Sequence, residues 1–366
     1  MMKKCWLAVI FALCAFIMVG CSRKEDDSNA PATAKKKKVL HVYIWADYIS
    51  ADVVHKFEKQ YNCRVQQDIF DSNEMMFAKL QAGAAGYDVL CPSHYFIKKM
   101  IGSNMVLKLD KEKLPNLAHL DPQVTSKLDE TVLDYSVPYF MSYTGLAYNK
   151  LLVENFEPTW NIFLRDDLKN RMTLLDDYSE VIGAAAKQLG YSAADLDDPE
   201  KGNERMDEVV KLALQWRKNI IKFDNEQYKN GLATGEFLVV MGYFSDLSQI
   251  VAENEDLGLA IPNEGCMMSC DMLAISSKAK EPELAYAFIN FLHEPENAAQ
   301  NITDVFAYCP NVDAVSLLDE EVREDDSIFV GEEVLANSEF QPELSAEQEE
   351  RHLDYWQKIK AGDASK

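Results

Sequence analysis

After the first 38 residues, stretches in which apolar residues have the spacing of a strand alternate with stretches in which they have the spacing of a helix. Within residues 39–45, aliphatic side chains occupy every second position, as in a strand with one buried face. Residues 53–57 then follow helical spacing, and the hydroxyl of Ser50 is placed to cap that helix. Strands at 64–70 and 87–92, each followed by a helix, repeat the alternation. This order predicts an α/β fold with a parallel sheet covered by helices.

The pattern changes after residue 134. Short strands at 135–139 and 144–149 have little helix between them, which indicates a crossing into a second lobe. An apolar run at 237–242 is typical of a buried strand, and a strand at 272–276 leads back to the first lobe. Two lobes joined by two crossings leave a cleft, where small ligands commonly bind. We expect lobe 1 to comprise residues 39–140 and 271–316, and lobe 2 residues 141–270 and 317–366.

The amino terminus has the features of an export signal. Two lysines precede an apolar run that ends at Gly20 and is short for a membrane span. Residues 16–21 resemble a bacterial lipobox in which Cys21 carries the lipid. A plain secretory signal or a membrane anchor is the alternative. We expect a signal peptide at residues 1–20, and a lipidated cysteine with a flexible tether at residues 21–38, which places the protein in the periplasm, anchored to a membrane.

Net charge and cysteine spacing argue against nucleic-acid binding and against a zinc site. The formal net charge of −23 disfavours nucleic acid as a partner and attracts cations. Cys266 and Cys270 have no neighbouring histidine or second cysteine pair, so we expect no zinc site. We likewise expect no other metal and no cofactor. The cysteines that remain after the signal and Cys21 are odd in number, which predicts at least one free thiol.

Acidic and aromatic residues gather where predicted strands end and helices begin. A ligand ammonium gains from carboxylates through charge-assisted hydrogen bonds and from aromatic faces through cation–π attraction. Grouped carboxylates are costly to bury unless a cation neutralises them. Each acid taken singly is also explained as a helix cap or a solvated surface charge. The candidate ligand residues of this kind are Trp45, Asp47, Tyr48, Ser93, Tyr95, Asp177, Glu180, Tyr243, Asp246 and Asp271.

Several of these residues lie in longer motifs with a family resemblance. The segments 43–49, 71–74, 87–93, 137–139 and 262–265 with 271–275 look like those of the spermidine/putrescine-binding proteins of bacterial ABC importers. The resemblance runs from about residue 39 to the carboxyl terminus. It implies a two-lobed type II periplasmic binding protein fold, a polyamine ligand, and a membrane permease with its ATPase as partners of a monomeric binding protein.

The resemblance also implies roles for residues of the first lobe. Trp45 and Tyr48 would hold the ligand methylenes between their rings, with Asp47 near one ammonium. Ser93 and Tyr95 would line the same wall.

From the second lobe, Glu180 would face them with Asp177 close by. Asp271 matches the acid expected to hold an ammonium, and Gln341 matches a late ligand contact. Tyr243 stands where the family usually has tryptophan. Asp246 matches an acid of putrescine-type members, which tilts the expected ligand towards putrescine over spermidine.

Two other classes of function stay open at this point. A binding protein for iron or a sugar would use the same fold. Iron sites favour paired tyrosines, so iron is the harder of the two to dismiss. An enzyme such as a glycosidase needs two carboxylates at a set separation. Further acids around such a pair disfavour a tuned acid and base, and the chain lacks the common hydrolase and phosphate-loop motifs. We therefore expect a binding protein and no enzyme.

Overall fold

The computed structural model describes residues 37–362. The expected signal peptide, the lipid site at Cys21 and most of the tether lie outside these residues. None of the helices within the described range is long and apolar enough to cross a membrane.

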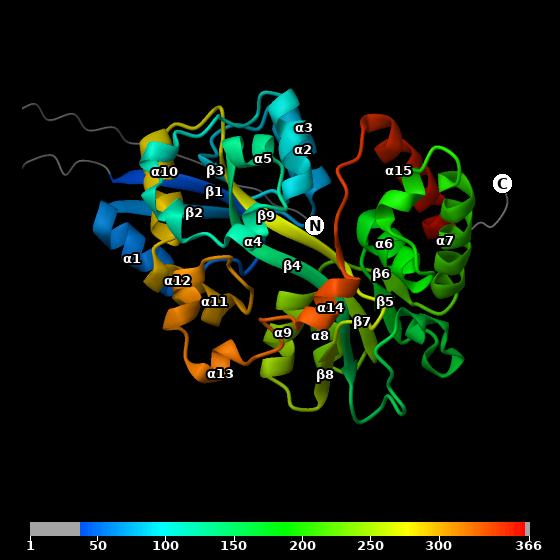
Figure 1. Ribbon diagram of the computed structural model, residues 1–366. Helices are drawn as coiled ribbons and strands as arrows, with labels where there is room; N and C mark the ends of the chain where they lie inside the picture. Colours follow the sequence, from blue (N-terminus) through cyan, green and yellow to red (C-terminus); the bar gives the residue numbers. More distant parts are fainter. Residues whose placement is uncertain (1–36, 363–366) are drawn as a thin grey trace, which may run out of the picture. The chain divides into compact units, whose positions relative to one another are not determined.

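The first lobe begins with three βα units, as the apolar pattern predicts. Strand β1 pairs in parallel with both β2 and β3, so the predicted parallel sheet is confirmed (Figure 1). The elements are β1 (Lys38–Ile44), α1 (Ala51–Tyr61), β2 (Cys63–Ile69), α2 (Asn73–Gln81), β3 (Val89–Leu90) and α3 (His94–Gly102).

The caps of the first two helices differ from each other. Ser72 caps α2 by accepting a hydrogen bond from the backbone N–H of Met75 over 3.1 Å. Ser50 precedes α1, but its side chain makes no cap hydrogen bond. Its hydroxyl donates instead to Oδ2 of Asp304 over 2.5 Å. The predicted Ser50 cap is therefore wrong, because a carboxylate from distant α11 (Pro295–Val305) competes for the hydroxyl.

One long strand, β4 (Ser136–Asn149), replaces the two short strands that the sequence predicts. Residues 140–143 have antiparallel partners on β9 (Met267–Ile275) at every position, so the strand does not break there. Residues 144–148 then pair with β7 (Val239–Tyr243). The sheet runs β2-β1-β3-β9-β4-β7-β5-β6, where β5 is Met172–Leu174 and β6 is Lys222–Phe223 (Figure 1). In addition, β10 (Glu339–Phe340) pairs with β9, and β8 (Leu257–Ala260) pairs with β4.

The second half of the sheet is again of βα type. Strand β5 pairs in parallel with β6 and β7. Trp160 and Trp216 are completely buried in the core there. The elements are β5 (Met172–Leu174), α6 (Tyr178–Gln188), α7 (Gly202–Arg217), β6 (Lys222–Phe223), α8 (Tyr228–Ala233), α9 (Phe244–Ala252) and β8 (Leu257–Ala260).

The carboxyl-terminal part covers both halves. Helix α10 (Pro282–Leu292) contacts α1 and β9, whereas α15 (Ala346–Ala361) contacts α6 and α7 (Figure 1). The lobe boundaries given above stay a prediction. The remaining elements are α4 (Pro122–Thr125), α5 (Glu130–Tyr135), α12 (Val312–Leu317), α13 (Glu320–Arg323), α14 (Glu332–Asn337) and β10 (Glu339–Phe340), with short 3-10 helices at Lys111–Lys113, Pro115–His119, Trp160–Leu164, Asp166–Leu168 and Ala193–Asp197.

Five cysteines lie in the described range, and all are free and buried, which confirms the expected free thiol.

Candidate functional site

A cavity of about 80 Å³ lies where β1, β3 and β9 meet the first turns of α6 and α9. Most of the candidate residues lie on its wall, although they come from segments far apart in the chain. The candidates that line it are Trp45, Tyr48, Ser93, Tyr95, Asp177, Glu180, Tyr243, Asp246 and Asp271.

Asp271 lies in the middle of β9 and is 4% exposed. The hydroxyl of Tyr48 donates to its Oδ2 over 2.5 Å, and the hydroxyl of Ser93 donates to Oδ1 over 2.6 Å. Burial raises the pKa of Asp271 to about 6, although these two hydrogen bonds act to lower it. Near neutral pH this side chain is therefore a buried anion held by neutral donors, without a counter-charge among its hydrogen-bond partners.

Glu180 lies in the first turn of α6 and is 6% exposed. The side-chain amide of Gln341 donates to its Oε1 over 3.1 Å. Its Oε2 is buried and has no hydrogen-bond partner within residues 37–362. Burial and the neighbouring Asp177 carboxylate raise the pKa of Glu180 to about 8. An unpartnered carboxylate oxygen in a cavity is a position where a donor, and above all a cationic donor, is stabilised.

Asp177 combines a structural and a site role. Its Oδ1 accepts from the backbone N–H groups of Ser179 and Glu180 and so caps α6. Its Oδ2 accepts from the hydroxyl of Tyr243 over 3.2 Å. The helix amino terminus favours negative charge at this position. The explanation of Asp177 as a helix cap and its place on the cavity wall are therefore both correct.

Asn73 lines the cavity and holds Ser93 and Tyr95 in place, and the candidate set omits it. Its Nδ2 donates to Ser93 Oγ and to the hydroxyl of Tyr95, each over 3.1 Å, and its Oδ1 accepts from the backbone N–H of Ser93. The 71–74 motif contains Asn73, so family resemblance could have identified it. The other lining residues outside the candidate set are Ala46, Phe70, Asp71, Ser142, Asn225, Ser245 and Ser269.

Aromatic rings form the apolar part of the wall. The indole of Trp45 packs on Phe70 with ring centroids 4.3 Å apart, and Tyr48 packs edge-on against Phe140 at 5.2 Å. Both contacts fix the rings, because neighbouring side chains restrict their rotamers. The cavity wall therefore combines carboxylates with aromatic faces. Within the described chain, no group of three or more His, Cys, Asp or Glu side chains is arranged to hold a metal ion.

Comparison with known proteins identifies the family. The model of the bacterial extracellular solute-binding proteins matches residues 52–329. The chain belongs to this family. The putrescine-binding periplasmic protein SpuD of Pseudomonas aeruginosa is 34% identical over 352 residues, which cover 90% of this chain and 94% of SpuD.

Solved structures agree with this assignment. A structure described as a putative spermidine/putrescine ABC transporter from Listeria monocytogenes has a TM-score of 0.79 at 31% identity, over 88% of this solute-binding protein and 99% of that chain. The TpPotD lipoprotein of Treponema pallidum has a TM-score of 0.78 at 30% identity, over 88% and 100% of the two chains. The type II periplasmic binding protein fold and the likeness to spermidine/putrescine-binding proteins are thereby confirmed.

Asp47 and Gln341 lie off the cavity wall of this solute-binding protein. Gln341 follows β10 and reaches the cavity only through Glu180. The side chain of Asp47 is 69% exposed, and its Oδ2 lies 3.7 Å from Nζ of Lys229. The same Nζ lies 3.2 Å from Oδ1 of Asp246. No local sequence pattern marks Lys229, because it reaches these acids through the tertiary placement of the short helix α8.

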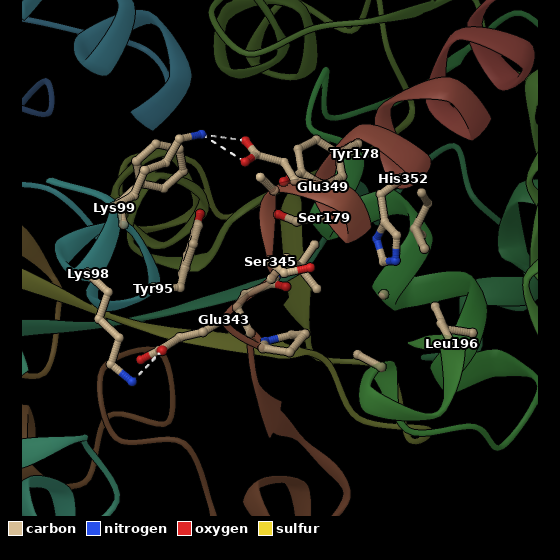
Figure 2. A pocket seen from close by; sticks show the side chains of 18 residues that line it. Tyr95, Lys98, Lys99, Tyr178, Ser179, Leu196, Glu343, Ser345, Glu349 and His352 are labelled. Carbon is tan, nitrogen blue, oxygen red and sulfur yellow. Dashed lines mark hydrogen bonds and ion pairs between the residues drawn. The ribbon is translucent and has the colours of Figure 1, made fainter. Parts of the chain in front are cut away.

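A second, larger cavity of about 410 Å³ adjoins the first, and Tyr95 lines both. Figure 2 shows ion pairs at its edge, from Lys99 to Glu349 and from Lys98 to Glu343. The lysine side chains are 38% and 41% exposed, so water screens both pairs. This cavity is lined by Gln341, the segment before α15, and residues of α3 and α6.

Proposed function

We propose that this solute-binding protein captures an aliphatic polyamine in the smaller cavity and delivers it to an ABC permease driven by its ATPase. The observation that carries this proposal is the presence of two buried acids, Asp271 and Glu180, in one aromatic-lined cavity, where Oε2 of Glu180 has no partner in the described part of the chain.

A slender molecule with positive ends suits each feature of this cavity. One ammonium supplies Asp271 with the counter-charge that its neutral hydroxyl partners lack. A second ammonium supplies Oε2 of Glu180 with a charged donor. The methylenes between them lie against the rings of Trp45 and Tyr243, which also attract the adjacent ammoniums. The small volume of the cavity favours such a chain over a bulky ligand.

We favour putrescine over spermidine as the preferred ligand. The relative SpuD is named for putrescine, and the Listeria structure is named for both. Spermidine remains the alternative within the same class.

We propose binding without chemical turnover. Members of the family are solute-binding proteins. In addition, the raised pKa values of Asp271 and Glu180 have a common cause in burial without a cation, which binding an ammonium relieves. A separate acid–base role is not needed to explain either value.

The proposed location is the periplasm, where a monomer is anchored to the membrane through a lipid on Cys21 and the tether at residues 21–38. The lipobox-like sequence supports this, and so does the description of the Treponema relative as a lipoprotein.

A ligand panel tests the proposed function. Protein starting at residue 22, freed of carried-over ligand by unfolding and refolding, is titrated by calorimetry with putrescine, cadaverine, spermidine and spermine. We expect saturable binding of putrescine and a raised melting temperature. Glucose serves as a control without charge, and metal analysis of the purified protein tests for iron. The absence of heat and of a melting shift with every polyamine would show that the ligand class is wrong.

A further inference from the structure

We propose that Lys229 is a specificity-determining residue. Its ammonium is paired with the carboxylate of Asp246, the acceptor that a further ammonium of a triamine would need. This inference rests on the proposed function and adds which polyamine length the site accepts.

The contacts of Asp246 are the first observation. Asp246 lines the cavity at the start of α9. Its Oδ1 lies 3.2 Å from Nζ of Lys229, and its Oδ2 accepts a hydrogen bond of 2.6 Å from the hydroxyl of Tyr228. Both oxygens therefore have partners on α8. Among residues 37–362, Asp246 is the one acid of the cavity wall that forms an ion pair with a lysine or arginine of the chain.

The second acid of Lys229 is the next observation. Asp47 lies in the loop after β1, and its Oδ2 is 3.7 Å from Nζ of Lys229 on α8. Its backbone has a φ of 52°, a conformation unusual for a residue with a side chain. The side chain of Lys229 is 22% exposed and that of Asp47 is 69% exposed. Lys229 thus links Asp246 on the wall to Asp47 at the rim.

These contacts divide the acids of the site into two kinds. Asp271 and Glu180 have no cationic partner among residues 37–362, and a diamine supplies one ammonium to each. Asp246 and Asp47 already share the Lys229 ammonium. A triamine that extends past Glu180 or Asp271 towards Asp246 meets a fixed positive charge, because the paired lysine repels the incoming ammonium and takes its acceptor. The Lys229 ammonium therefore takes the place that the third ammonium of a triamine would occupy.

The test removes the charge of Lys229 and retains its apolar stem. In Lys229→Met, Asp246 becomes free to accept an ammonium. We expect the ratio of spermidine affinity to putrescine affinity to rise about tenfold or more, measured by calorimetry on protein starting at residue 22. Lys211→Met, at an exposed position of α7, removes the same charge far from the cavity and should leave the ratio unchanged.

A second variant distinguishes an effect of the freed Asp246 charge from a loosening of the structure around Lys229. In Lys229→Met combined with Asp246→Asn, the free acid is absent, so the ratio should fall back towards that of the unmodified protein. A ratio that is unchanged in Lys229→Met, or that stays high in the double variant, would overturn the role of Lys229. If Lys229→Met does not fold, Lys229→Gln gives the same comparison. If the unmodified protein binds neither polyamine, the proposed function fails and not this inference alone.

Discussion

The side-chain amide of Gln341 donates to Oε1 of Glu180 over 3.1 Å, and this contact holds the other oxygen of the carboxylate in the cavity. Gln341 is placed there by β10, whose residues Glu339 and Phe340 pair in parallel with Met267 and Met268 of β9. The strand that carries Asp271 therefore also positions Glu180, through β10 and Gln341. The proposed capture of a polyamine uses both acids.

Proton release should accompany polyamine binding. The pKa of Glu180 is about 8 in the empty cavity, so a large part of the population is protonated at pH 7.5. An ammonium placed beside the carboxylate favours the ionised form and lowers this pKa, which releases the proton. Calorimetric enthalpies of putrescine binding at pH 7.5 should therefore differ between phosphate and Tris buffers by an amount set by the buffer ionisation enthalpies. Glu180→Gln should remove most of this difference. Equal enthalpies in the two buffers would contradict the pKa that we assign to Glu180.

The melting temperature of the empty protein should rise when the pH falls from 8 to 7. Glu180 and Glu74 have pKa values raised to about 8 and about 7, in each case mainly by burial and then by Asp177. An acid with a raised pKa binds more protons in the folded state than in the unfolded state, so acidification through the raised pKa stabilises the fold. Below about pH 6.5, His94 opposes this trend, because burial lowers its pKa to about 4.

Saturating putrescine should flatten the same melting profile, since the bound cation keeps Glu180 ionised. A matched profile for Glu180→Gln isolates the share of this side chain. A melting temperature that falls between pH 8 and pH 7 in the empty protein would be inconsistent with the buried acids.

Asp271→Asn should weaken putrescine binding at least tenfold, about 1.4 kcal/mol, without lowering the melting temperature of the empty protein. The amide retains an acceptor for Tyr48 or Ser93 but loses the charge that an ammonium needs. Because burial raises the pKa of Asp271, the ionised acid does not stabilise the empty fold at neutral pH. Affinity measured by calorimetry, with melting as the control, separates the two effects. Unchanged affinity would remove Asp271 from the ligand site.

Gly265→Ala should destabilise the fold strongly, by about 3 kcal/mol or more. Gly265 has a φ of +85°, and an added Cβ would lie 2.1 Å from the backbone oxygen of Asn337. Gly331→Ala is the matched control, because nothing lies within 4 Å of its added Cβ in the described structure. Urea unfolding measures both. Equal free energies of unfolding for the two variants would show that Gly265 is not closely packed against the backbone of Asn337.

The sequence predicts the β1 and β3 ends of the site well, because each strand carries its ligand residues directly after its apolar run. Trp45, Ser93 and Tyr95 reach one cavity by this local logic. The continuous β4 is missed because its residues 140–143 are held by partners on β9, about 130 residues away along the chain. The Ser50 cap fails for a similar reason, since Asp304 takes the hydroxyl.

Contacts between side chains of distant elements are the least predictable part of the site. Lys229 lies outside every motif, yet it contacts two of the candidate acids. The position of Gln341 behind Glu180 depends on the parallel pairing of a two-residue strand, which no periodicity reveals. Residue types and strand order therefore indicate the chemistry of the site, whereas the partner of each acid follows from tertiary structure.

The most direct test of two-ended ammonium binding is a calorimetric comparison of putrescine with butylamine, which has the same four-carbon chain and a single ammonium. If one ammonium binds at Asp271 and the other at Glu180, putrescine should bind at least about tenfold more tightly, since each charge-assisted hydrogen bond contributes roughly 1.5–3 kcal/mol. Equal affinities for the two ligands, or no binding of putrescine, would contradict a cavity with an acid for each end of the ligand.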